Sequence, residues 1–221
     1  MITQRYRKDY IGEFIIRNTS WAGGKKHTQR EWIPNPIENH HISGRAACIA
    51  TVADATHFDF TMLQHHKGGL LGSKKLQTYG TSEVAKHMRL DFTVEKDQTL
   101  LQELVNQDYF KKNILYTTPR NCIKFPKAFY TIPHNPVVIK QVALAYLAAF
   151  DGHQEIFLLG YHADADIGHS NWDVQMEQVI AAYPVTKFYH ISYKSQTPAS
   201  WKNYNNLVQL THREFITYAD I

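Results

Sequence analysis

The densest group of side chains able to transfer protons follows an apolar segment in the last third of the chain. After Glu155–Leu159 and Gly160, the closely spaced polar residues are His162, Asp164, Asp166, His169 and Ser170. Histidine titrates near neutral pH and can take a proton from a sugar hydroxyl that lies within hydrogen-bond reach. The segment is therefore a candidate site for general base catalysis.

The same cluster allows a metal-dependent alternative, because histidine and aspartate both bind metal ions. Phosphoester chemistry would then use Asp164, Asp166 and His169 as ligands. Their spacing matches no standard ligand signature, so the sequence predicts no bound metal and no cofactor. With 13 histidines in the chain, a structural role is also open for each of them.

Further candidates lie where other apolar runs end in polar residues. The run Phe14–Ile16 leads towards Gly23 and Gly24, and backbone N–H groups in such a turn can cradle a phosphate. Arg120 follows another strand-like run and offers a guanidinium suited to phosphate or carboxylate. For the turn after Phe14–Ile16, the competing interpretation is an ordinary strand-to-loop exit. For Arg120, it is a surface arginine that anchors a loop. Ser82 follows a third run, where it either caps a helix or helps to bind an anion.

His134 and Asn135 precede the strongest helical segment, Pro136–Phe150. We expect Asn135 to be the N-cap, Pro136 to be the first helical residue and Gly152 to mark the end. A ligand oxygen near His134 and Asn135 would then meet free amides at the positive end of the helix dipole.

The elements that must hold these loops alternate along the chain. Continuous apolar, β-branched and aromatic runs predict strands covered on both faces, as in a parallel sheet. These runs are Phe14–Ile16, Ala47–Ala53, Leu76–Tyr79, Leu90–Val94, Ile114–Tyr116, Ala128–Ile132, Glu155–Leu159 and Thr186–Ile191. Helical patterns between them cover Phe58–His65, Ser82–Met88, Gln98–Val105, Pro136–Phe150 and Trp172–Ala182. The alternation predicts βαβ units with right-handed crossovers.

We therefore predict a single Rossmann-like α/β domain over residues 1–221, with a mostly parallel sheet flanked by helices. The segment 21–45 is rich in glycine, proline and polar residues and is expected to be an irregular loop insert. Residues 208–221 are expected to form a short strand or hairpin that closes the sheet. In open α/β sheets ligands bind beyond the carboxyl ends of the strands, where the candidate loops are expected.

Composition narrows the class of protein. A content of 43% hydrophobic and 20% charged residues is typical of a folded soluble protein, and a net charge of +4 does not indicate a dedicated nucleic-acid binder. No apolar run approaches the roughly 20 residues of a membrane-spanning helix, and no secretory signal is predicted. Cys48 and Cys122 are expected to be reduced and buried, which predicts a cytoplasmic location.

Part of the chain also carries a family resemblance. The apolar segment Val142–Phe150, followed by Glu155–Gly160 and then Gly168-His169-Ser170, resembles the helix–strand unit of bacterial sialyltransferases of glycosyltransferase family 42 and of related Rossmann-like motility-glycosylation proteins. Trp172–Ala182 and Lys187–Ile191 follow in a similar order of helix and strand. The resemblance implies a Rossmann-like fold, a sugar-nucleotide ligand and a general base at the histidine of the Gly-His-Ser motif.

A fainter similarity covers the run Ile15–Ser20, which resembles the family's first strand and the loop after it. By that resemblance, Asn18 and Ser20 would lie near the nucleotide.

The leading functional hypothesis is a glycosyltransferase-like protein that binds a nucleotide or nucleotide sugar and transfers the sugar to a glycan or another hydroxyl acceptor. His169 would take the hydroxyl proton, and helix N-termini with Arg120 would stabilise the leaving phosphate. The other expected ligand contacts are Asn18, Ser20, His134, Asn135, Gly160, His162, Asp164 and Ser170. The alternative is a non-catalytic accessory or assembly protein, of a virus or mobile element, that retains the fold. A homo-oligomer is compatible with either hypothesis.

Overall fold

Eight strands in the described part of the chain form one sheet in which every neighbouring pair is parallel. The strands are β3 (Arg45–Ile49), β4 (Gln77–Thr81), β5 (Phe92–Val94), β6 (Ile114–Thr117), β7 (Tyr130–Thr131), β8 (Glu155–Leu159), β9 (Lys187–Ile191) and β10 (Leu207–Leu210). The computed structural model describes residues 44–52, 58–63, 76–161, 171–192 and 197–221 with their side chains, and the backbone of 13–22, 25–34 and Gln64.

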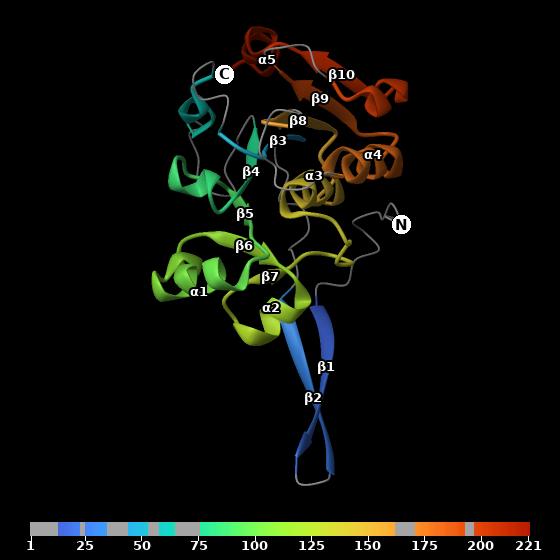
Figure 1. Ribbon diagram of the computed structural model, residues 1–221. Helices are drawn as coiled ribbons and strands as arrows, with labels where there is room; N and C mark the ends of the chain where they lie inside the picture. Colours follow the sequence, from blue (N-terminus) through green and yellow to red (C-terminus); the bar gives the residue numbers. More distant parts are fainter. Residues whose placement is uncertain are drawn as a thin grey trace.

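The order of the strands across the sheet is β10-β9-β8-β3-β4-β5-β6-β7, which Figure 1 shows from top to bottom. Of these eight strands, β3 comes first in the chain, and it lies in the middle of the sheet. β4 to β7 extend the sheet on one side of β3, and the chain then returns to add β8, β9 and β10 on the other side. The order in which successive strands are added to the sheet therefore reverses between β3 and β8, and this position is a topological switch point. The predicted Rossmann-like α/β fold is confirmed.

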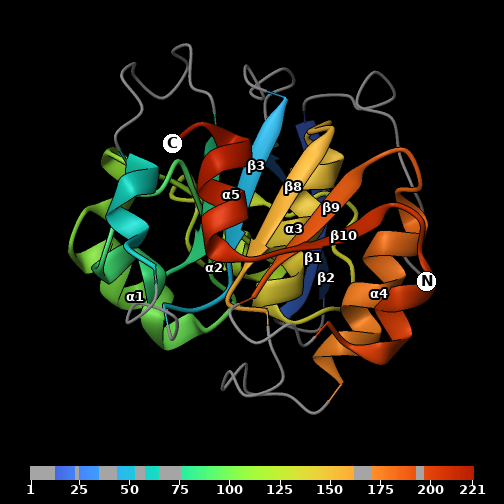
Figure 2. The same cartoon turned by 90° about the horizontal axis from the view of Figure 1, so that it is seen from above.

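Helices cover both faces of the sheet. The helical elements of the described residues are α1 (Gln98–Asn106), α2 (Pro119–Lys124), α3 (Lys140–Phe150), α4 (Trp172–Ala182) and α5 (His212–Ala219), with 3-10 segments η3 (Phe60–Gln64), η4 (Val84–Lys86), η5 (Tyr109–Lys111) and η6 (Ala199–Asn203). α3 and α4 lie on one face, and α5 lies on the other (Figure 2). The domain therefore has three layers.

The strands are apolar on both faces because both faces are covered. Along β3, Ala46 and Cys48 point into the core beneath α3, while Ala47 and Ile49 point into the core beneath α5. A strand buried in this way has no solvated face to supply the polar half of an alternating pattern. This is why the continuous apolar runs predicted the parallel strands.

The predicted elements agree best in the last third of the chain, where β8 and α4 have the expected bounds. The expected strand or hairpin at 208–221 is instead β10 followed by α5. Thr211 begins α5 with a capping box, in which its hydroxyl accepts from Glu214 N and Glu214 accepts from Thr211 N. The reciprocal bonds satisfy two backbone donors at the start of the helix.

The predicted start of α3 is wrong. The helix begins at Lys140, with Ile139 rather than Asn135 at the N-cap position. His134 and Asn135 have left-handed backbone conformations, with φ of 52° and 41°, and Asn135 N bonds to Ile132 O in a turn. An N-cap has extended backbone dihedrals, so a left-handed Asn135 cannot cap the helix.

The expected irregular insert at 21–45 contains a regular strand. β1 (Glu13–Ala22) and β2 (Lys25–Pro34) form an antiparallel hairpin that is a sheet of its own. The hairpin extends away from the parallel sheet, and β2 passes near α2 and β7 (Figure 1). The run Phe14–Ile16 therefore belongs to a hairpin and is not a strand of the parallel sheet.

Within the part of the chain that the structure describes, no helix is long and apolar enough to cross a membrane.

Candidate functional site

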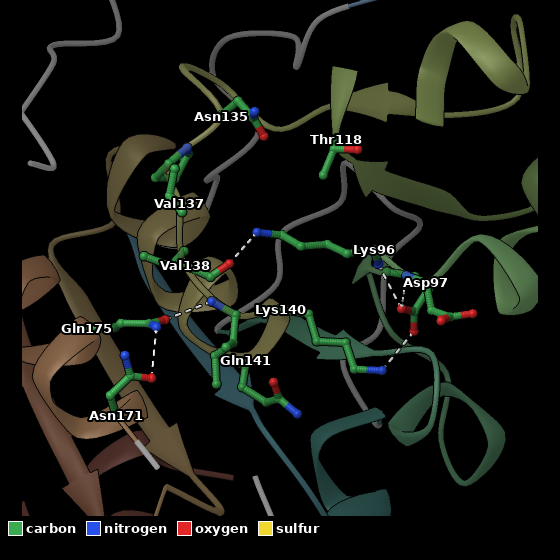
Figure 3. Close-up of a pocket in the computed structure, with 13 residues that line it drawn as sticks. Lys96, Asp97, Thr118, Asn135, Val137, Val138, Lys140, Gln141, Asn171 and Gln175 are labelled. Carbon is green, nitrogen blue, oxygen red and sulfur yellow. Dashed lines mark hydrogen bonds and ion pairs between the residues drawn. The ribbon is translucent and has the colours of Figure 1, made fainter. Parts of the chain in front are cut away.

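A pocket of about 940 Å³ opens at the carboxyl edge of the sheet. Its lining residues come from the ends of β5 and β6, from the segment that leads into α3 and from the first turn of α4 (Figure 3). They are Glu95, Lys96, Asp97, Thr118, Asn135, Pro136, Val137, Val138, Ile139, Lys140, Gln141, Asn171 and Gln175. This edge is where open α/β sheets bind their ligands.

The floor of the pocket is organised by the carboxylate of Glu95, directly after β5. Glu95 is fully buried. Its Oε1 accepts from the backbone N–H groups of Lys96 at 2.7 Å and Asp97 at 2.8 Å. Its Oε2 accepts from the Ser82 hydroxyl and from Lys140 Nζ, the latter at 3.0 Å. A buried carboxylate with all of these donors is fixed in place and cannot turn towards a ligand without losing them.

Lys140, the first residue of α3, is held between two carboxylates. Its Nζ lies 2.5 Å from Glu83 Oε1 and 3.0 Å from Glu95 Oε2. Burial disfavours its charged form, but the hydrogen bonds that Lys140 donates to the two carboxylates outweigh burial and raise its pKa. Burial also opposes the charged form of Glu83, yet its bond with Lys140 lowers the pKa of Glu83. The two negative charges offset the charge of Lys140 within the site.

Lys96 has a different environment. Its side chain reaches across the pocket, and Nζ donates to the backbone carbonyl of Val138 at 2.5 Å (Figure 3). Burial lowers the pKa of Lys96 from 10.5 to about 8, because a buried ammonium loses hydration. Its own backbone carbonyl accepts from Asn121 Nδ2 at 2.9 Å, which ties the segment after β5 to α2.

The opposite wall joins α3 to α4. Gln175 Oε1 accepts from Ile139 N at 2.8 Å, and Gln175 Nε2 donates to Asn171 Oδ1 at 3.2 Å. A side chain of α4 thus satisfies a backbone donor at the start of α3, where the first amides have no intrahelical partner. At the rim, Val137 is 97% exposed.

The structure brings only part of the predicted site together. Asn135 lines the pocket. Its neighbour His134 is exposed and contacts Phe150 edge-on, with ring centroids 5.7 Å apart. Arg120 is exposed in the first turn of α2 and is not among the residues that line the pocket.

Gly160 has a structural role at the switch point. Its φ is +74°, and a Cβ there would lie 2.5 Å from the backbone oxygen of Thr51, which follows β3. Only glycine tolerates both the left-handed conformation and so close an approach of two chain segments. The predicted position at a strand end is confirmed, because Gly160 directly follows β8.

Other predicted residues lie elsewhere or outside the described residues. Asn18 and Ser20 lie within β1, opposite Gln29 and His27 of β2, and so belong to the hairpin rather than to the end of a parallel strand. The residues of the predicted catalytic loop that fall outside the described part of the chain are His162, Asp164, Asp166, His169 and Ser170.

Sequence reasoning missed Glu95, Lys96 and Lys140. A usable signal existed for the first two, because three consecutive charged residues follow the buried run Phe92–Val94 at a strand end. The role of Lys140 could not be recognised, because the predicted helix began four residues earlier and placed Lys140 in its second turn. Its role depends on where α3 begins, and a contact from α4 determines that start.

Among the residues that the structure describes, no group of three or more histidine, cysteine, aspartate or glutamate side chains is arranged to hold a metal ion.

No protein-family model, curated protein or solved structure matches the chain. The class of protein therefore follows from the fold and the pocket. The chain is a Rossmann-like α/β protein whose pocket at the carboxyl edge of the sheet contains two lysines.

Proposed function

We propose that this protein binds a nucleotide or nucleotide sugar in the pocket at the carboxyl ends of β5 and β6. The observation that carries the proposal is the meeting of Lys96 with the first turn of α3 in one pocket at this edge. A helix N-terminus offers free N–H groups and a positive dipole end, and a lysine adds a full charge, so together they suit a phosphate.

The carboxamide side chains on the other lining segments support a polar, uncharged partner beyond the phosphate. Asn135, Gln141, Asn171 and Gln175 all line the pocket. Each carboxamide both donates and accepts hydrogen bonds, which suits the hydroxyls of a sugar or the edge of a base. The volume of about 940 Å³ is within the range of small-molecule sites.

Sugar transfer is the reaction that we propose for this site. His169 would take the proton of an acceptor hydroxyl, whose oxygen forms the new bond to the anomeric carbon as the bond to the nucleotide phosphate breaks. The leaving phosphate would keep the bonding electron pair and be stabilised by Lys96 and the α3 amides. His169 precedes the pocket residue Asn171 by two positions in the chain, which supports this role.

Thermal-shift and calorimetric titration with nucleoside diphosphates and nucleotide sugars test the binding. A ligand at 100 times its Kd should stabilise the protein by about 2.7 kcal/mol. Gln141→Trp should block the pocket and abolish the shift. Arg120→Ala should leave the affinity unchanged, because Arg120 lies outside the pocket. Absence of any stabilisation at millimolar concentrations would refute the proposal.

Turnover is tested separately from binding. His169→Ala should abolish sugar transfer to a hydroxyl acceptor while the Kd for the donor changes little. Unchanged transfer would remove His169 from the mechanism. Binding without transfer by the unaltered protein, across a panel of acceptors, would instead support a non-catalytic protein that uses the fold to sense or carry a nucleotide.

A further inference from the structure

The two lysines of the pocket differ in what surrounds them. Lys140 Nζ contacts the carboxylates of Glu83 and Glu95. Within the described residues, Lys96 has no carboxylate at ion-pair distance, and its Nζ is held by the uncharged carbonyl of Val138. The charge of Lys140 is therefore already matched inside the protein, whereas that of Lys96 is not.

The bond to Val138 positions Lys96 without using up its capacity to bind. An ammonium has three N–H donors, and the carbonyl takes one of them. Two donors remain for a ligand on an amine whose place is already defined across the pocket (Figure 3). A preorganised donor loses less side-chain entropy on binding than a free lysine does.

We propose that Lys96 is the cation that binds the phosphoryl group, that Lys140 serves to hold Glu95 and the start of α3, and that the phosphoryl group and a proton bind together at Lys96. This inference rests on the proposed nucleotide site and assigns its anion-binding residue and its regulation by pH. Lys96 is bound to a carbonyl that cannot compensate an ammonium charge, so an anion is the partner that completes its environment.

The charged groups around Lys96 are consistent with the joint binding of a phosphoryl group and a proton at this residue. On its own segment, Glu95 accepts from two backbone amides, and Asp97 accepts from Thr99 N and Leu100 N at the start of α1. From α3, Lys140 faces the site with its charge matched by two carboxylates. The side chains that line the pocket from α2 and α4 are neutral: they are Thr118 before α2, and Asn171 and Gln175 of α4.

The free protein has a Lys96 pKa of about 8, so about half of these side chains are neutral at pH 8. A bound phosphate favours the ammonium and raises that pKa. Lys96 should therefore take up about half a proton when the phosphate binds at pH 8, and almost none when it binds at pH 6.5.

The first experiment compares affinities by calorimetry for the diphosphates of adenosine, cytidine, guanosine and uridine. Lys96→Met should weaken the best of them about 10- to 100-fold, as expected for loss of a charged hydrogen bond. Lys96→Arg keeps the charge and should stay within a few-fold of the unaltered protein. Lys124→Met removes an exposed lysine outside the pocket and should have little effect.

Lys140 is tested by Lys140→Arg, which preserves a cation beside buried Glu95, and by Lys140→Met where circular dichroism shows that it folds. Both should weaken binding of the best diphosphate less than Lys96→Met does, because Lys140 acts only by holding Glu95 and the start of α3. A loss larger than that caused by Lys96→Met would assign the phosphate to Lys140 and overturn the inference.

The second experiment measures proton uptake from the binding enthalpy in two buffers of different ionisation enthalpy. Because the terminal phosphate ionises near pH 6, it exchanges few protons at pH 8. Lys96→Arg should bind without the half-proton uptake, since arginine stays protonated. Equal uptake by the unaltered protein and this variant would overturn the linkage. If no diphosphate binds the unaltered protein, the proposed function fails and the inference fails with it.

Discussion

At the scale of single residues, Glu95 connects the sheet to the pocket. Its carboxylate is fully buried and accepts hydrogen bonds from two backbone amides, a serine hydroxyl and a lysine. A charge removed from water in this way is stable only when its partners are all present. The same group therefore shapes the segment after β5 and holds the first residue of α3.

Glu95→Gln should lower the free energy of unfolding by about 3 kcal/mol, because it leaves Lys140 without its buried partner. Glu83→Gln is the matched control. The side chain of Glu83 is 51% exposed, so this change should cost no more than about 1 kcal/mol. Urea denaturation at pH 7 measures both. Equal losses for the two variants would show that the buried carboxylate has no special role.

At the scale of elements, the start of α3 determines the shape of the pocket. Almost the whole of α3 is buried, and its first turn lines the pocket. The side chain of the N-cap residue Ile139 makes no capping hydrogen bond. Its backbone amide donates instead to Gln175 Oε1 of α4. The pocket wall thus depends on the packing of two helices that are distant in sequence.

Gln175→Ala should destabilise the protein by about 1 kcal/mol, because Ile139 N loses its partner, and it should also weaken nucleotide binding. Thr211→Ala is the control, because it removes the N-cap of α5, a helix that does not line the pocket, and should cost a similar amount of stability. Thermal unfolding and nucleotide titration of both variants separate the effects. Only Gln175→Ala should change the affinity; an equal change for Thr211→Ala would trace the effect to general stability.

At the scale of the whole molecule, Lys96 links stability to pH. Its pKa is about 8 in the folded protein, against 10.5 as its ordinary value. Between these two pH values the unfolded chain binds more protons at this position than the folded protein does. The contribution of Lys96 to the free energy of unfolding therefore rises with pH over this window.

Comparison with Lys96→Met isolates that contribution from the other titrating groups. The stability of the unaltered protein relative to Lys96→Met should increase from about pH 8 to about pH 10.5 in the absence of nucleotide. Urea denaturation at intervals over pH 7 to 10.5 measures it. Lys124→Met, at an exposed position, should show no such trend. A flat difference for Lys96→Met would place Lys96 in an ordinary solvated environment.

Much of the parallel sheet was predictable, because strands covered on both faces are apolar without interruption. β8 and α4 were predicted with the bounds that the structure has. The run Phe14–Ile16 was assigned to the same sheet although it belongs to the antiparallel hairpin. A short apolar run indicates a strand but carries no information about which strand it pairs with.

The sequence by itself determined most strands of the parallel sheet and the class of fold, since hydrophobic patterning depends on neighbours along the chain. It also determined that polar residues follow several strands. Only the tertiary structure decided which strand ends share a pocket. Glu95 meets Lys140 across 45 positions, and Gln175 defines the start of α3 from 36 positions away. Such contacts depend on how the sheet is ordered and how its helices pack, and no local pattern in the chain encodes them.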